Sequence, residues 1–280
     1  MPRAMPAAPA TAPTPARVST RDDLRARLVR ARANERVPPE RYGFDLAAAT
    51  RLYRVTTFLH RRWFRTVCHG IEQLPRGRVM LVANHASHAL AWDGANILSA
   101  CLLDAEPPRL VHAMADHRLM QLPILGSSAR RIGAVDGNRA TCIRLLRDGG
   151  AVLVFPEGAR AHDRRFRDRY RLAPFGSGFL RVAMLARAPI VPVAVVGGEE
   201  EAPLLANPGW LKRLVGTHAA PITPTLVLPL PVRYRLHFGA PIRLHGPCNT
   251  STVAAGVRRV REALCALLAR GLAARRRVFW

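Results

Sequence analysis

The chain has 280 residues, of which 49% are hydrophobic, a length and composition that suit one globular domain with appendages. It carries 43 Lys and Arg residues against 19 Asp and Glu, a formal net charge of +24, which favours an anionic partner. Its five cysteines are scattered and form no C-x-x-C pair, which argues against a disulfide framework or a zinc site. No uninterrupted apolar stretch reaches the 18 residues that indicate a membrane-spanning helix.

The first 63 residues divide into a tail and a helical segment. Residues 1–20 are rich in Pro and Ala, which predicts a disordered tail. Residues 21–63 predict two helices, the first running to about residue 34 and the second over 44–63. An apolar stripe on the second helix is formed by Leu52, Val55, Leu59 and Trp63. With arginines on its other faces, this helix fits a bilayer interface or a structural helix packed on the domain, and both interpretations stay open.

Residues 64–280 alternate predicted strands and helices. This order indicates a single α/β domain with a mostly parallel central sheet flanked by helices. The apolar runs 79–83 and 151–155 are typical of buried strands. Because ligands bind at the carboxyl edge of such sheets, the polar residues that follow these runs are the first candidates for a site.

The remaining elements are predicted from shorter patterns. Strands are expected at 64–68, 109–114, 190–196 and 232–238, and helices at 95–103, 139–147, 179–188 and 252–274. Pro192 predicts that its strand is edge-like or irregular, because proline cannot donate to a ladder. The arginine-rich stretch 164–171 is interpreted as a solvated loop.

Each of the two buried strands is followed by a motif whose side chains suit catalysis or ligand binding. Residues 84–94 read Asn-His-Ala-Ser-His-Ala-Leu-Ala-Trp-Asp-Gly. A histidine with an aspartate shortly downstream can act as an oriented general base. Residues 154–160 read Val-Phe-Pro-Glu-Gly-Ala-Arg. This turn offers a carboxylate, a close backbone approach and a guanidinium suited to phosphate.

The order of these motifs resembles the phospholipid/glycerol acyltransferase family, which includes the lysophosphatidic acid acyltransferases. Residues 155–160 match the family's third block, Phe-Pro-Glu-Gly followed by Arg, and residues 189–192 match its fourth, Pro-Ile-Val-Pro. The second block, a Gly-containing turn that ends in Arg, is matched by 133–139 in slightly elongated form. Residues 169–176 and 195–200 are similar to a bacterial subset related to monoacylglycerol and diacylglycerol acyltransferases.

The first block departs from the family's pattern, which places an Asp at a fixed short spacing after Asn-His. His85 follows an Asn but has Leu90 at that spacing, whereas His88 has Asp93 there but no preceding Asn. The subset that this chain resembles often has a longer interval ending in Trp-Asp-Gly, as at 92–94. We favour His85, because it ends a buried strand and its backbone is therefore fixed; His88 is the alternative base.

The resemblance covers roughly residues 64–244 and implies transfer of a fatty acyl group from acyl-CoA or acyl carrier protein to a hydroxyl of a glycerol-type or lysophospholipid acceptor. In that reaction His85 would remove the hydroxyl proton, and Asp93 would orient the imidazole and stabilise its cation. No cofactor and no metal is expected, since the acyl carrier is a co-substrate.

The resemblance also implies roles in substrate binding. Glu157 would bind an acceptor hydroxyl or hold a nearby arginine, and Gly158 would let the backbone approach the substrate. Arg160 and Arg139 would grip a phosphate on the acceptor or the carrier, with solvated surface charges as the alternative.

The expected partners are an acyl thioester donor, a lipid acceptor and an anionic membrane surface, contacted from the cytoplasmic side. A nucleic acid is not expected, because the sequence lacks an RNP-like, helix-turn-helix or zinc signature and its arginines are spread along the chain. The alternative function is that of a catalytically silent lipid-binding protein on the same fold, suggested by the unusual spacing between histidine and aspartate.

Overall fold

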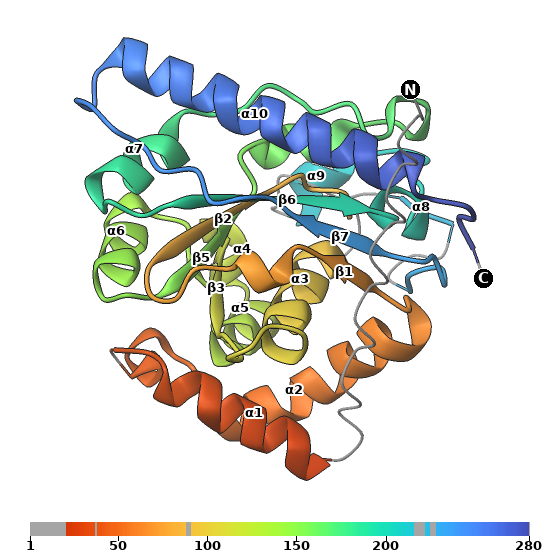
Figure 1. The fold of residues 1–280 in the computed structure, drawn as a ribbon. Helices are drawn as coiled ribbons and strands as arrows, with labels where there is room; N and C mark the ends of the chain where they lie inside the picture. Colours follow the sequence, from red (N-terminus) through yellow and green to blue (C-terminus); the bar gives the residue numbers. More distant parts are fainter. Residues whose placement is uncertain (1–20, 37, 88–90, 216–221, 225–227, 280) are drawn as a thin grey trace, which may run out of the picture.

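The computed structural model describes residues 21–36, 38–87, 91–215, 222–224 and 228–279. In this part of the chain a sheet of seven strands has the order β1-β7-β6-β2-β5-β3-β4 (Figure 1). Neighbouring strands are parallel except β6 and β7, which confirms the predicted α/β fold with a mostly parallel sheet. The strands are β1 (Val67–His69), β2 (Val79–Ala83), β3 (Val111–Ala115), β4 (Val135–Asp136), β5 (Ala151–Val154), β6 (Ile190–Val196) and β7 (Arg235–Phe238).

Helices cover both faces of this sheet (Figure 1). They are α1 (Arg21–Ala33), α2 (Leu46–Phe58), α3 (Trp92–Leu103), α4 (His117–Gln121), α5 (Pro123–Arg131), α6 (Arg139–Arg147), α7 (Gly178–Leu185), α8 (Gly198–Glu201), α9 (Gly209–Val215) and α10 (Thr250–Ala273). Among the helices of the described ranges, none is both long and apolar enough to cross a bilayer.

The buried strands divide their side chains between two cores. Leu81 and Val193 belong to the core that also contains apolar residues of α1, α2 and α3. Met80 and Val82 belong to the core beneath α6, α7 and α10. Because both faces are covered, β2 is apolar at every position rather than alternating, as the sequence predicted.

Pro192 was predicted to mark an edge-like or irregular strand; the edge-like alternative is wrong, and the irregular one is confirmed. Strand β6 lies inside the sheet between β7 and β2, and all seven of its residues are buried. Proline is tolerated there because pairing with the segment after β7 is irregular at this point, although Gly239 N still donates to Pro192 O at 2.8 Å. The antiparallel ladder ends at the pair Val193–Phe238, and an isolated bridge resumes at Ile190–Ile242. Pro192 therefore lies where no ladder bond from its own nitrogen is needed.

The predicted apolar stripe of the second N-terminal helix is wrong in part. The buried side of α2 is formed by Ala48, Ala49, Thr50 and Tyr53. Leu52, Leu59 and Trp63 are only partly buried, and Val55 is 56% exposed. The buried face is thus centred on small residues, which let α2 approach its neighbours closely.

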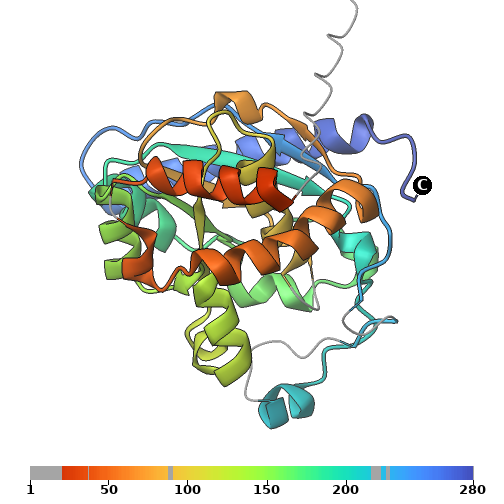
Figure 2. The same ribbon diagram turned by 90° about the horizontal axis from the view of Figure 1, so that it is seen from below.

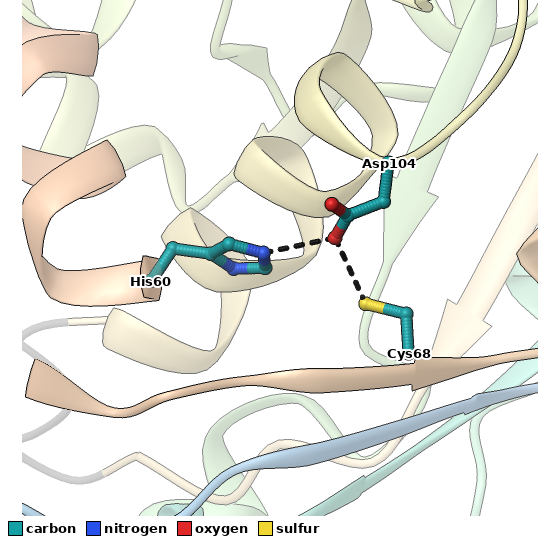
Figure 3. A group of neighbouring side chains, drawn as sticks. All are labelled: His60, Cys68 and Asp104. Carbon is teal, nitrogen blue, oxygen red and sulfur yellow. Dashed lines mark hydrogen bonds and ion pairs between the residues drawn. The ribbon is translucent and has the colours of Figure 1, made fainter. Parts of the chain in front are cut away.

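A polar cluster ties the end of the N-terminal helical segment to the sheet (Figure 3). The buried His60 lies in a π-helical turn after α2, and its Nε2 is 2.9 Å from Asp104 Oδ2. The thiol of Cys68 donates to the same oxygen at 3.2 Å, and Arg61 pairs with Asp104 Oδ1 at 2.6 Å. His60, Cys68 and Asp104 could also hold a metal ion, the one such group in the described ranges, but here they satisfy one another.

Candidate active site

The centre of the candidate site is a histidine–aspartate pair at the carboxyl edge of the sheet. His85 follows β2, and Asp93 lies in the first turn of α3. His85 Nδ1 is 2.7 Å from Asp93 Oδ2, and the same oxygen accepts the backbone N–H groups of Ala86 at 2.7 Å and Ser87 at 3.2 Å. The structure therefore brings together the two residues that the sequence paired.

The electrostatics of this pair suit a general base. Burial opposes charge on both groups, but their mutual attraction outweighs it. The pKa of His85 consequently lies above its ordinary value, and the pKa of Asp93 lies below its own. An ionised Asp93 holds the proton of neutral His85 on Nδ1, so that Nε2 carries the lone pair able to accept a proton. The imidazole also stacks on the ring of Phe155, with centroids 4.4 Å apart.

Two further strands fix the position of His85. The amide of Asn84 bonds across to β6: its nitrogen donates to Val195 O at 3.1 Å, and its oxygen accepts from Val195 N at 2.8 Å. Glu157, which follows β5, accepts the backbone N–H of His85 at 3.1 Å. His85 is thus tied toward β5 through its own backbone N–H and to β6 through the side-chain amide of Asn84, the residue before it.

Glu157 is fully buried, and its carboxylate is engaged within the protein. Besides His85, it accepts the backbone N–H of Ala173 at 2.7 Å and pairs with Arg164. Arg164 also pairs with Glu199 and donates to the backbone oxygen of His85 at 3.2 Å. Of the two roles expected for Glu157, the structure shows the holding of an arginine.

The interpretation of 164–171 as a solvated loop is wrong for Arg164, whose side chain is only 5% exposed. Two buried carboxylates meet at this point, and a guanidinium between them compensates both. Most of the other arginines in the stretch are exposed, as expected.

Three consecutive glutamates after β6 escaped the sequence reasoning, although all three are buried. Glu199 pairs with Arg164, and Glu200 pairs with Arg275 at 2.7 Å. Glu201 is hydrogen-bonded to the hydroxyls of Ser87 and Tyr234. Burial raises the pKa of Glu201 well above its ordinary value, so this carboxyl beside the site binds its proton more tightly than an exposed glutamate does. Their position after a buried strand was the available signal, the same one that identified His85.

The other predicted residues lie outside this buried cluster. Gly158 has a φ of +57°, a left-handed conformation that favours glycine, and it is exposed. Arg160 is exposed and donates to the backbone oxygen of Pro174 at 3.2 and 3.0 Å. Arg139 is exposed at the start of α6, and neither arginine contacts the histidine–aspartate pair. His88 lies outside the described residues.

The sheet thus presents the bonded pair of His85 and Asp93 and the buried Glu157 at its carboxyl edge, where ligands bind in open α/β sheets. Residues 65–196 match the family model described as Acyltransferase. An uncharacterised protein of Mycobacterium tuberculosis is 36% identical over 257 residues, which cover 86% of this chain and 71% of that protein.

Two other similar proteins carry functional names. The "DGAT1/2-independent enzyme synthesizing storage lipids" of Gallus gallus is 27% identical over 65% of this chain and 53% of its own length. The crystal structure of the 1-acyl-sn-glycerophosphate acyltransferase of Thermotoga maritima shares the fold, with a TM-score of 0.53, 20% identity, and coverage of 82% of this chain and 83% of that one. The chain belongs to the glycerolipid acyltransferase family and is an O-acyltransferase of that type.

Proposed function

We propose that this protein transfers a fatty acyl group from acyl-CoA or acyl carrier protein to a hydroxyl of a glycerol-type or lysophospholipid acceptor, with His85 as general base. The observation that carries the proposal is the buried bond between His85 Nδ1 and Asp93, at the edge of the sheet where substrates of α/β proteins bind. Family membership supports glycerolipid acyl transfer, and this geometry supports the assignment of the base.

The proposed step balances without a covalent enzyme intermediate. His85 Nε2 takes the proton of the acceptor hydroxyl as its oxygen attacks the thioester carbonyl carbon. The tetrahedral intermediate then collapses, the carbon–sulfur bond breaks, and the imidazolium returns the proton to the thiolate. Asp93 stabilises the transient imidazolium and keeps the ring in one orientation.

Glu157 and Arg164 act in this proposal as positioning residues. Glu157 holds the backbone N–H of His85, and Arg164 holds its backbone oxygen. Together they fix the peptide that carries the base. We assign phosphate binding on the acceptor or the carrier to Arg160 and Arg139, because both guanidinium groups are exposed and phosphate accepts two of their N–H groups at once.

We further propose that the protein works at an anionic membrane surface, where its lipid acceptor resides. The exposed side of α2 supports this, since Val55 and Phe58 are exposed by more than half, at 56% and 55%, beside the exposed Arg51 and Arg54. Apolar and cationic side chains on one helix are suited to a bilayer interface.

The test is a panel of labelled acyl-CoA with lysophosphatidic acid, monoacylglycerol, diacylglycerol and other lysolipids, run with the wild-type protein and the His85→Ala variant. We expect transfer to at least one acceptor by the wild type and none above background by the variant. Lipid binding without transfer to any acceptor would instead identify a silent lipid-binding protein. Equal transfer by both proteins would refute the role of His85.

A further inference from the structure

Two helical projections leave the sheet at the same edge as the candidate site. The hairpin of α4 and α5 follows β3, and the segment with α9 follows β6 and α8. Since β2, β3, β5 and β6 are mutually parallel, both projections start at the carboxyl edge, where β2 and β5 deliver His85 and Glu157. Figure 2 shows α4–α5 in yellow-green and α9 in cyan, both extending from one side of the molecule.

Large apolar side chains are exposed on both projections. On α5, Ile124 is 79% exposed and Leu125 is 48% exposed; on α9, Trp210 is 66% exposed. Leu205 and Leu228, in the chain around α9, are also exposed. Single exposed apolar residues are common on protein surfaces, but such a set on two projections from one side of the molecule marks a surface that contacts an apolar partner.

The charge of the projections identifies the kind of partner. Residues 117–131 and 202–215 contain no Asp or Glu, although the chain has 19 acidic residues in all. Arg130, Arg131 and Arg213 are exposed within these two segments. Exposed apolar side chains flanked by arginines, with no acid between them, complement the interface of an anionic bilayer.

The α9 projection is also connected to the motif that carries Glu157. Asn207, just before α9, donates through Nδ2 to Asp163 Oδ1 at 2.9 Å, and Asp163 ends the turn that begins at Gly158. A surface seated on α9 therefore lies next to the substrate-binding turn rather than on a remote face.

We propose that the tips of α5 and α9, led by Ile124 and Trp210, insert into the headgroup region of an anionic bilayer and turn the carboxyl edge of the sheet toward the lipid. This inference rests on the proposed function only for its consequence, which is that a lipid acceptor in the bilayer gains direct access to His85. The docking itself requires no catalysis.

The test compares the double variant Ile124→Glu, Trp210→Glu with the control Leu185→Glu. Leu185 is 52% exposed on α7, outside both projections. Flotation with vesicles of equal phosphatidylglycerol and phosphatidylcholine, and with phosphatidylcholine alone, measures binding at low ionic strength. We expect the wild type to prefer the anionic vesicles, the double variant to lose at least about 10-fold in partitioning, and the control to bind like the wild type.

Activity and melting measurements separate this proposal from the proposed function. With a short-chain acceptor and acyl-CoA below their micellar concentrations, the double variant should transfer like the wild type. With acceptor embedded in vesicles it should be impaired. The proposal would be overturned if the double variant bound vesicles like the wild type, or if the Leu185→Glu control lost as much binding. It would also be overturned if the double variant had a lowered melting temperature or lost activity on the dispersed substrates. If vesicle binding depended on Ile124 and Trp210 but the wild-type protein acylated no acceptor, the docking surface would be supported and the proposed function would be refuted.

Discussion

Replacing Arg164 by Met should destabilise the protein strongly, because it would remove the guanidinium that pairs with two buried carboxylates. The side chains of Arg164, Glu157 and Glu199 are 5%, 0% and 1% exposed. Glu157 retains backbone N–H donors from His85 and Ala173, and Glu199 retains the backbone N–H of Tyr170 at 3.4 Å, but both carboxylates lose the positive charge of Arg164. Removing one partner from a buried ion pair costs about 3–5 kcal/mol.

A loss of that size lowers the melting temperature by roughly 6–20 °C in a domain of this length. Thermal and urea unfolding of Arg164→Met would measure it, with Arg165→Met, the exposed neighbouring arginine, as the matched control. Adding Glu199→Gln to Arg164→Met should recover part of the loss, because it removes one uncompensated charge. An Arg164→Met protein as stable as the control, or a double variant no more stable than Arg164→Met, would refute this account of the cluster.

Further predictions concern the acid–base groups. The kcat of His85→Ala should fall by about 100-fold or more, because the variant lacks the base. Asp93→Asn should be severely impaired, and His88→Ala should stay active. An active His85→Ala protein together with an inactive His88→Ala protein would assign the base to His88. Because the raised pKa of His85 must be exceeded to free its base form, kcat/KM should fall as pH drops through a midpoint above 6.5, and a midpoint below that value would contradict the pairing. The pKa of Glu201 is raised in the folded state, so this carboxyl binds its proton more tightly there than in the unfolded chain. Its contribution to the free energy of unfolding is therefore full below pH 4.5. Above that pH the contribution declines by about 1.4 kcal/mol per pH unit until the folded-state pKa is reached. Glu201→Gln should fold and remove this decline, which urea unfolding between pH 4 and 7 would detect.

The sequence predicted the parts of the fold and site that are encoded locally. Buried parallel strands show as continuous apolar runs, and the residue after such a run must lie at the sheet's edge, which was enough to find His85 and Glu157. Helix α6 was predicted at its observed bounds, 139–147, and the structure shows that the Asn138 side chain caps its first turn by accepting the N–H of Thr141.

The features that escaped prediction depend on contacts between distant residues. Arg164 is buried because Glu199, 35 positions away, and Glu157 both face it, and nothing in an arginine-rich stretch distinguishes the one buried member. Glu201 reaches Ser87 across 114 positions, and no pattern local to the run of three glutamates indicates this contact. The position of Pro192 inside the sheet likewise depends on irregular pairing with residues near 240.

The unusual spacing between His85 and Asp93 suggested a catalytically silent lipid-binding protein. This spacing does not disturb the contact between the two side chains. Asp93 lies eight positions beyond His85, yet it bonds to the imidazole Nδ1 at 2.7 Å. The same carboxylate oxygen also accepts the N–H groups of Ala86 and Ser87, the two residues after the histidine. Its position is therefore set by the start of the loop and by α3, not by the number of residues between them. Because general-base catalysis depends on this contact and not on sequence spacing, the longer interval is compatible with the full chemistry of the family.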